Sequence, residues 1–111
     1  MPPRLTTEMQ ISAAIRRAEQ HGIYASILKT GDARSGSILL EIQTGMHSSQ
    51  LLSRYADIDG EYDWMVISGE GWLDSASCHE RREREIARDP DCWVVLVEDS
   101  RGRNIFTFDE E

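Results

Sequence analysis

The sequence predicts an α+β fold: an antiparallel sheet of five or six strands with two helices, in the order α-β-β-β-β-α-β(-β). Three observations lead to this prediction. An amphipathic helical pattern spans residues 7–21, short β-rich runs with glycine punctuation follow it, and a continuous apolar run at 92–97 comes after a polar helical stretch. A chain of 111 residues fits one domain, so we expect residues 1–111 to share a single core.

The first helix is predicted over residues 7–21. Thr6 or Thr7 can cap its start, because a hydroxyl there accepts a hydrogen bond from the exposed amides of the first turn. Gly22 follows where a left-handed residue commonly ends a helix. The apolar positions recur at three- and four-residue steps and form one stripe, which consists of Ile11, Ala14, Ile15 and Ala18.

Four strand-like runs come next, at residues 23–29, 37–43, 50–55 and 62–67, with turn residues between them. Short β-rich runs with glycine-containing turns at this spacing indicate an antiparallel meander. In a meander each strand pairs with the one before it, which places the fourth strand antiparallel to the first.

The second helix is predicted to start near Leu73, with Asp74 or Ser75 as its cap, and to continue to Arg88. It is unusually polar, because residues 80–85 mix glutamates and arginines that can pair across one turn. The helix ends at Asp89 and Pro90, since the residue before a proline is displaced from helical geometry. Such a helix covers a sheet with a narrow apolar stripe and leaves most of its surface in water.

The strongest strand signal is the run 92–97, whose apolar side chains do not alternate, so both of its faces should be buried. We expect it to lie antiparallel beside the 23–29 strand, and residues 105–108 can return as a short final strand. Segment 38–42 is also interpreted as apolar on both faces. Two such strands need cover on both sides of the sheet, which a second copy of the chain would complete, and we therefore expect a homodimer.

Composition indicates a cytoplasmic protein. A net charge of −8 opposes general binding to a nucleic-acid backbone, and the arginines between 81 and 88 are interleaved with glutamates. No apolar run approaches the ~20 residues of a membrane span, and residues 1–6 contain no apolar signal region. Cys78 and Cys92 are the only cysteines and lack C-x-x-C spacing, which favours buried thiols over a disulfide.

The run from Asp89 to Asp99, with the sequence DPDCWVVLVED, resembles a small uncharacterised alphaproteobacterial family, domain of unknown function 1491. That family usually has leucine where this chain has Cys92. The resemblance implies a compact α+β domain, and it implies no activity, cofactor or partner. It extends to residues 12–17, to Gly22, and to Gly31-Asp32 with Gly36.

No group of residues in the sequence carries a specific catalytic chemistry. The histidines and cysteines lack metal-ligand spacing, and no G-x-S-x-G nucleophile elbow is present. The glycine-rich run 68–71 has no lysine and does not match a phosphate loop. We therefore predict no catalytic residues, no metal and no cofactor.

The tryptophans are candidate interaction residues. Trp93 is expected to anchor its strand in the core. Trp72 lies near the start of the second helix, where a large aromatic side chain is either an exposed contact for a partner or a packed lid over the sheet edge.

Four carboxylates that flank the 92–97 strand are further candidate interaction residues. Asp89 and Asp91 precede it, and each can accept backbone amides in a turn. Glu98 and Asp99 follow it, beside two arginines, where a solvated turn is favoured over a site.

These features together favour a non-enzymatic protein-interaction module that acts as a homodimer, with a further protein partner left open. The alternative comes from another class of protein. It is a small hydrolase or nuclease-like enzyme that uses Asp89, Asp91, Glu98 and Asp99 around a divalent cation, because hard cations prefer oxygen ligands.

Overall fold

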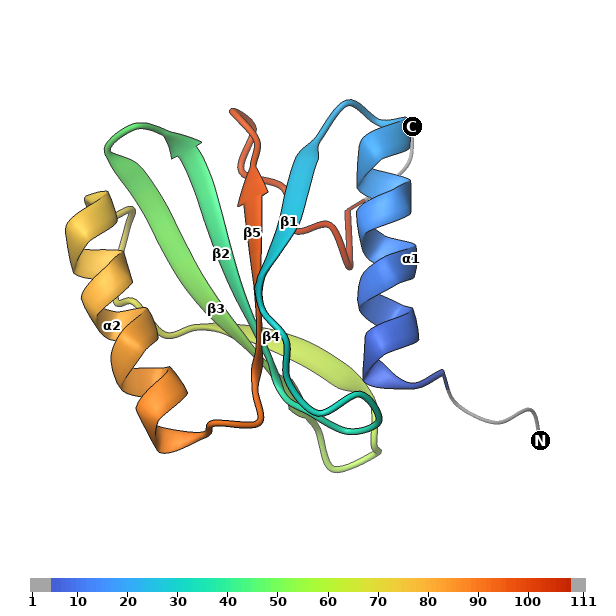
Figure 1. Cartoon of the computed structure of the whole chain (residues 1–111). Coiled ribbons are helices and arrows are strands. Elements are labelled where there is room, and N and C mark those ends of the chain that lie inside the picture. Colours follow the sequence, from blue (N-terminus) through green and yellow to red (C-terminus); the bar gives the residue numbers. More distant parts are fainter. Residues whose placement is uncertain (1–4, 109–111) are drawn as a thin grey trace.

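A computed structural model describes residues 5–108 and contains two helices and five strands within that range (Figure 1). Residues 1–4, part of the stretch predicted to contain no apolar signal region, and the acidic run 109–111 lie outside the described residues. Neither helix is long and apolar enough to cross a membrane, among residues 5–108. The elements are α1 (Thr7–Gln20), β1 (Tyr24–Lys29), β2 (Ile38–Gly45), β3 (Ser48–Ala56), β4 (Tyr62–Val66), α2 (Ser75–Arg88) and β5 (Trp93–Glu98).

The strands form one sheet in the order β1-β5-β2-β3-β4. β5 pairs antiparallel with β1, as predicted. Its other neighbour is β2, and because this pairing is parallel, the prediction of a wholly antiparallel sheet is wrong. The predicted meander is correct from β2 to β4 and wrong at its first step, where β5 separates β1 from β2.

The loop between β1 and β2, residues 30–37, makes room for this insertion. A tight hairpin would hold the two strands about 5 Å apart, which leaves no space for a third. The loop instead passes over the start of β5, where the N–H of Asp32 donates to Asp91 O at 2.9 Å and the N–H of Trp93 donates to Ser37 O at 2.8 Å.

The predicted final strand at residues 105–108 does not form, and this stretch consists mainly of turns. Both sides of β5 are already taken by β1 and β2, so no free edge remains beside it. The chain crosses the α1 face of the sheet instead, where Ile105 and Phe108 are buried. These apolar residues are therefore core residues of a non-strand segment, which is why their pattern wrongly predicted a strand.

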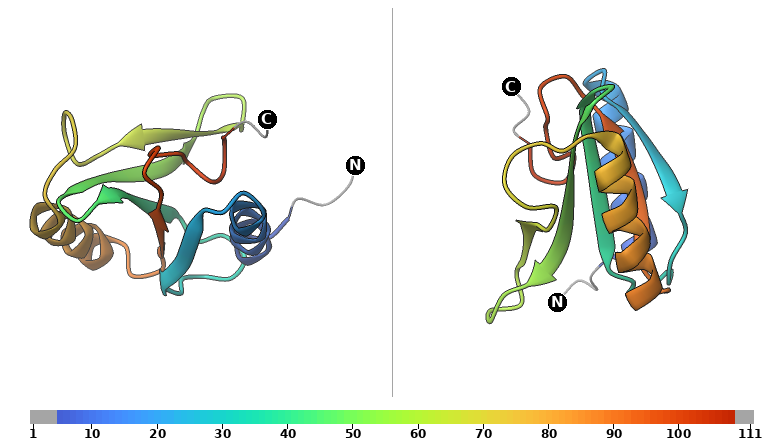
Figure 2. Two further views of the ribbon diagram at one scale, coloured as in Figure 1. Left: turned by 90° about the horizontal axis from the view of Figure 1, so that it is seen from above. Right: turned by 90° about the vertical axis from the view of Figure 1, so that its left-hand side faces the viewer.

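The two helices lie on opposite sides of the sheet, as the view from above in Figure 2 shows. α1 and residues 105–108, the C-terminal segment, cover the larger cluster, which includes Leu40, Val95 and Trp93. The α2 side holds a smaller cluster, in which Leu39 and Val94 are buried. Burial on both faces of β2 and β5 is thus confirmed within one chain, and the homodimer is not needed to provide that cover.

α1 matches its prediction closely. Thr6 caps it by accepting a hydrogen bond from the N–H of Met9 at 3.2 Å, and Gly22, at φ 72°, follows its C-terminal end. The predicted stripe points into the core, where Ile11, Ala14 and Ala18 are buried and Ile15 is partly buried.

α2 begins at Ser75, and its N-cap is Asp74, one of the two caps predicted for a helix that starts near Leu73. Leu73 itself lies before the helix and exchanges backbone hydrogen bonds with Ser49. Segment 38–42 is not apolar on both faces, since Glu41 lies on the α2 side with only 2% of its surface exposed. Arg82 of α2 donates to the Glu41 carboxylate at 2.8 Å, and this pairing lets a charge occupy the middle of β2.

Candidate functional site

Trp93 is part of a structural joint, as its predicted place in the core implies. Its indole N–H donates to Asp32 O at 2.7 Å, and 2% of the residue is exposed. Two glycines allow the loop between β1 and β2 to approach the segment before β5 closely. A Cβ on Gly31 would lie 2.3 Å from Asp91 O, and one on Gly36 would lie 2.6 Å from the same atom. Trp93 is therefore not available to a partner.

Trp72 combines both roles considered for it. Its ring packs over the turn that follows β5, so closely that a Cβ on Gly102 would lie 3.0 Å from it and 3.2 Å from Thr44. The residue still exposes 42% of its surface. Trp72 is thus a lid with one open side.

The four candidate carboxylates do not come together. Asp89 and Asp91 precede β5, Glu98 is its last residue and Asp99 follows it, so the two pairs are separated by the length of the strand, about 20 Å. Within residues 5–108 no group of three His, Cys, Asp or Glu side chains is placed to hold a metal ion. The arrangement that the metal-dependent alternative requires is absent from this part of the chain.

Asp99 and Asp89 each have a local structural role. Asp99 is buried and accepts hydrogen bonds from Arg103 Nε at 2.8 Å and Nη2 at 3.0 Å. These bonds, together with nearby backbone N–H groups, lower the pKa of Asp99 to about 2 against the opposing effect of burial. Asp89 accepts a hydrogen bond from Ser37 Oγ, which ties the end of α2 to the start of β2.

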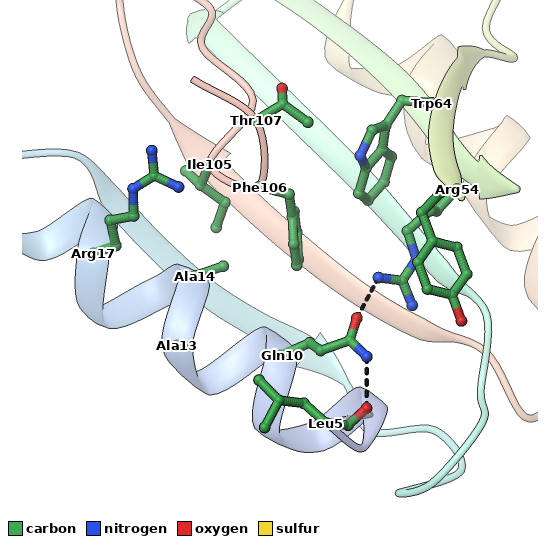
Figure 3. Close-up of a pocket in the computed structure, with 11 residues that line it drawn as sticks. Leu5, Gln10, Ala13, Ala14, Arg17, Arg54, Trp64, Ile105, Phe106 and Thr107 are labelled. Atoms are coloured by element: carbon green, nitrogen blue, oxygen red, sulfur yellow. Dashed lines mark hydrogen bonds between the residues drawn. The ribbon is translucent and has the colours of Figure 1, made fainter. Parts of the chain in front are cut away.

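A pocket of about 340 Å³ lies between α1, the β3–β4 pair and the C-terminal segment (Figure 3). Its floor includes Ala14 and Ile105, and the polar side chains that line it include Gln10, Arg17, Arg54, Tyr62 and Thr107. The pocket is formed by four separate segments of the chain. No sequence motif marks it, because its residues meet only after the sheet has formed.

Arg54 is the polar centre of this pocket. Its Nη1 donates to Gln10 Oε1 at 2.6 Å, and Gln10 Nε2 in turn donates to Leu5 O at 2.7 Å. The guanidinium carbon lies 3.8 Å from the centre of the Tyr62 ring, a cation–π contact. Burial lowers the pKa of Arg54 from its ordinary value, but an arginine remains charged in a protein.

Aromatic side chains form the opposite wall. The rings of Trp64 and Phe106 lie 5.0 Å apart at an angle of 35°. Farther along α1, Arg17 donates to Phe108 O, and its guanidinium lies 4.6 Å from the Phe108 ring. The C-terminal segment is thereby fixed against α1, which closes this end of the pocket.

A second hollow, of about 650 Å³, adjoins the pocket and shares Leu5, Gln10, Arg54 and Tyr62 with it. Hydroxyl groups and Arg34 line its far side. No acidic side chain lines either hollow, among the residues that the structure describes. The charged side chains that line these two hollows are therefore arginines, on a chain whose net charge is −8.

The opposite edge of the sheet is formed by β1, whose single strand neighbour within residues 5–108 is β5. Three apolar side chains of β1 are exposed there: Tyr24 at 60%, Ile27 at 42% and Leu28 at 47%. The register of the β1–β5 pair shifts between Ile27 and Lys29. The sequence contained a signal for this edge, since the run 24–28 has no charged residue.

Comparison with known proteins identifies structures with the same fold. A crystal structure and an NMR structure of a DUF1491 family protein from Caulobacter crescentus are each 34% identical to this chain with a TM-score of 0.81. The crystal structure covers 96% of this chain and 97% of that one, and the NMR structure covers 96% of both. Protein Atu0922 from A. tumefaciens, solved in solution, is 26% identical over 86% of each chain with a TM-score of 0.73.

No curated protein matches the chain. The sequence profile of the family described as "Protein of unknown function (DUF1491)" matches residues 5–107, almost the whole length. The match includes every element of the fold and both surfaces described above. The chain therefore belongs to the DUF1491 family of proteins of unknown function.

Proposed function

We propose that the chain is a cytoplasmic, non-enzymatic protein-interaction module that works as a homodimer joined along edge strand β1. The observation that carries this proposal is the exposure of Tyr24, Ile27 and Leu28 on a strand with one open edge. An open edge presents unpaired backbone N–H and C=O groups, which are a ready template for another strand. The cytoplasmic location is supported by the free, buried thiols of Cys78 and Cys92.

The side chains of β1 lack the protection that sheet edges usually carry. Charged residues commonly guard such edges against pairing, and residues 24–28 contain none. Lys29 is not a guard, because its Nζ donates to Pro90 O at 2.5 Å and Cys92 O at 2.9 Å and is thus held against its own chain. The other edge strand, β4, carries a charge at its second residue, Asp63.

Antiparallel pairing of β1 with β1 of a second copy supplies hydrogen-bond partners to the unpaired backbone N–H and C=O groups of both edge strands. The pairing is isologous, with a twofold axis that passes near Ser26, so each contact occurs twice and the assembly is closed. It extends the five-stranded sheet across two chains and brings the exposed apolar side chains of each β1 against the other.

The mass in solution tests the dimer. Light scattering coupled to size-exclusion chromatography should give twice the 12.6 kDa of one chain. Ile27→Lys places a charge on the shared edge and should yield monomers. Met65→Lys on the β4 edge, where Met65 is 54% exposed, is the matched control and should leave the dimer intact.

Two outcomes contradict the proposal. One is a mass of a single chain at every protein concentration. The other is an equal response to both lysine variants, since the interface would then not involve β1.

A further inference from the structure

We propose that the pocket between α1, the β3–β4 pair and the C-terminal segment binds a small organic anion, a carboxylate carried on a flat apolar body. Arg54 holds the carboxylate, and Trp64 and Phe106 contact the body. The site lies toward the β4 edge of the sheet, away from β1, so this inference does not depend on the proposed dimer.

The first support is the unpaired charge of Arg54. A charge removed from water needs compensation, and arginines that are largely buried are usually paired with a carboxylate. Arg82 and Arg103 follow this rule, with Glu41 and Asp99 as partners at 2.8 Å. Arg54 forms no ion pair with any described residue, although acidic residues outnumber basic ones by 20 to 12.

The second support is the way Arg54 is held. Gln10 accepts from Nη1, and the Tyr62 ring lies against the guanidinium, so the plane of the group is fixed before any ligand arrives. The Nε–Nη2 edge donates no hydrogen bond to the described residues. Two parallel N–H donors on one edge match the two oxygens of a carboxylate, which favours a carboxylate over a neutral ligand.

The third support is the character of the remaining walls. Ala14 and Ile105 are buried apolar groups at the floor, and the partly exposed rings of Trp64 and Phe106 form one side. A small-molecule site typically combines such walls with a few polar groups that set orientation, and about 340 Å³ is near the lower limit of known ligand pockets. The apolar body must therefore be small.

The surrounding charge also favours an anion. Besides Arg54 itself, Arg34 lines the adjoining hollow. Within residues 5–108, no acidic side chain lines the pocket or this hollow. An anion is therefore attracted locally despite the negative charge of the whole chain.

Two probes of the same shape separate the charge from the apolar body. The ¹⁵N-labelled chain is titrated with 3-phenylpropionate and, separately, with its neutral amide, 3-phenylpropionamide. We expect the indole N–H signal of Trp64 to shift and saturate with a dissociation constant of about 1 mM or lower for the acid, and the amide to bind at least about tenfold more weakly. The indole signals of Trp72 and Trp93 are internal controls, because neither residue lines the pocket.

Substitutions then test the assigned residue. Arg54→Gln should weaken binding of the acid by about tenfold or more, and Arg54→Lys should give an intermediate affinity, because it keeps the charge and loses the paired donors. Arg84→Gln, on the exposed side of α2, is the matched control and should change nothing.

Three results overturn the proposal. These are no shift of the Trp64 signal up to about 10 mM acid, equal affinity for acid and amide, and binding that persists unchanged in Arg54→Gln. If the glutamine variant does not fold, the comparison of the two probes on the unmodified chain decides alone.

Discussion

The indole N–H of Trp93 donates to the backbone oxygen of Asp32 at 2.7 Å and so joins the first residue of β5 to the loop between β1 and β2. The N–H of Asp32 returns a hydrogen bond to Asp91 O. The two stretches that carry the family resemblance, around Gly31 and around Trp93, thus meet in space. The residues of these two stretches form a structural joint that holds β5 between β1 and β2, and they do not form a catalytic or binding site.

Substitution of Gly31 tests how tightly this joint is packed. Because a Cβ there would lie 2.3 Å from Asp91 O, Gly31→Ala must displace backbone and should lower the free energy of unfolding by about 2–3 kcal/mol. Urea denaturation followed by circular dichroism measures the loss. Gly45→Ala is the control, since its Cβ would meet nothing within 4 Å, and a similar loss in both variants would argue against the tight joint.

The sequence predicted the helices and strands well because local signals determine them. Apolar spacing and Gly22 defined α1, and Pro90 marked the end of α2. The order of the strands depends on contacts between residues far apart in the chain, such as the pairing of Leu40 with Val95. Local periodicity contains no information about such a pairing, so the parallel β2–β5 contact could not be predicted.

The candidate site was harder to predict for the same reason. Arg54 lies two residues after Leu52 on β3 and therefore on the same, core-facing side of the sheet. This inward-facing charge was the signal available in the sequence. The role of Arg54 in a pocket depends on Gln10, Trp64 and Phe106, which come from other parts of the chain. The carboxylates near β5 were conspicuous in sequence, yet they lie at opposite ends of the strand.

The buried pair of Glu41 and Arg82 leads to a second prediction. Arg82→Met leaves the Glu41 carboxylate buried without its partner and should cost about 3 kcal/mol of unfolding free energy. The double variant Glu41→Leu with Arg82→Met removes both charges and should recover most of the loss, because an apolar pair can replace a buried ion pair.

Chemical denaturation at neutral pH measures these variants. Arg84→Met on the exposed side of α2 should change the unfolding free energy by less than about 0.5 kcal/mol. A loss in Arg82→Met no larger than in this control would show that Glu41 does not need its partner.

Asp99 makes stability depend on pH in the acid range. Its pKa is about 2 in the folded chain and 3.8 in the ordinary state, so the folded form favours the charged carboxylate. The resulting stabilisation, about 2 kcal/mol, is complete above the ordinary pKa and is lost as the pH falls through the range from 3.8 to about 2.

Asp99→Asn should therefore be less stable than the unmodified chain by about 2 kcal/mol at neutral pH, and the difference should shrink toward zero as the pH approaches 2. Urea titrations across this pH range measure it. Glu98→Gln, at an exposed neighbouring position, is the control. A difference between Asp99→Asn and the unmodified chain that stays constant with pH would contradict the assigned role of the Arg103 pair.

The two thiols provide a last prediction, on reactivity. Cys78 and Cys92 are almost completely buried, and burial raises the pKa of both, to about 11 for Cys78, where Glu41 and Asp74 add to the effect. Alkylation requires the thiolate and access to it, so iodoacetamide should label the native chain only as fast as it opens. Mass spectrometry should show slow labelling that accelerates with urea. Ala76→Cys, at an exposed position on α2, should be labelled rapidly at its new thiol, and equally fast labelling of the unmodified chain would mean that α2 does not shield Cys78 from solvent.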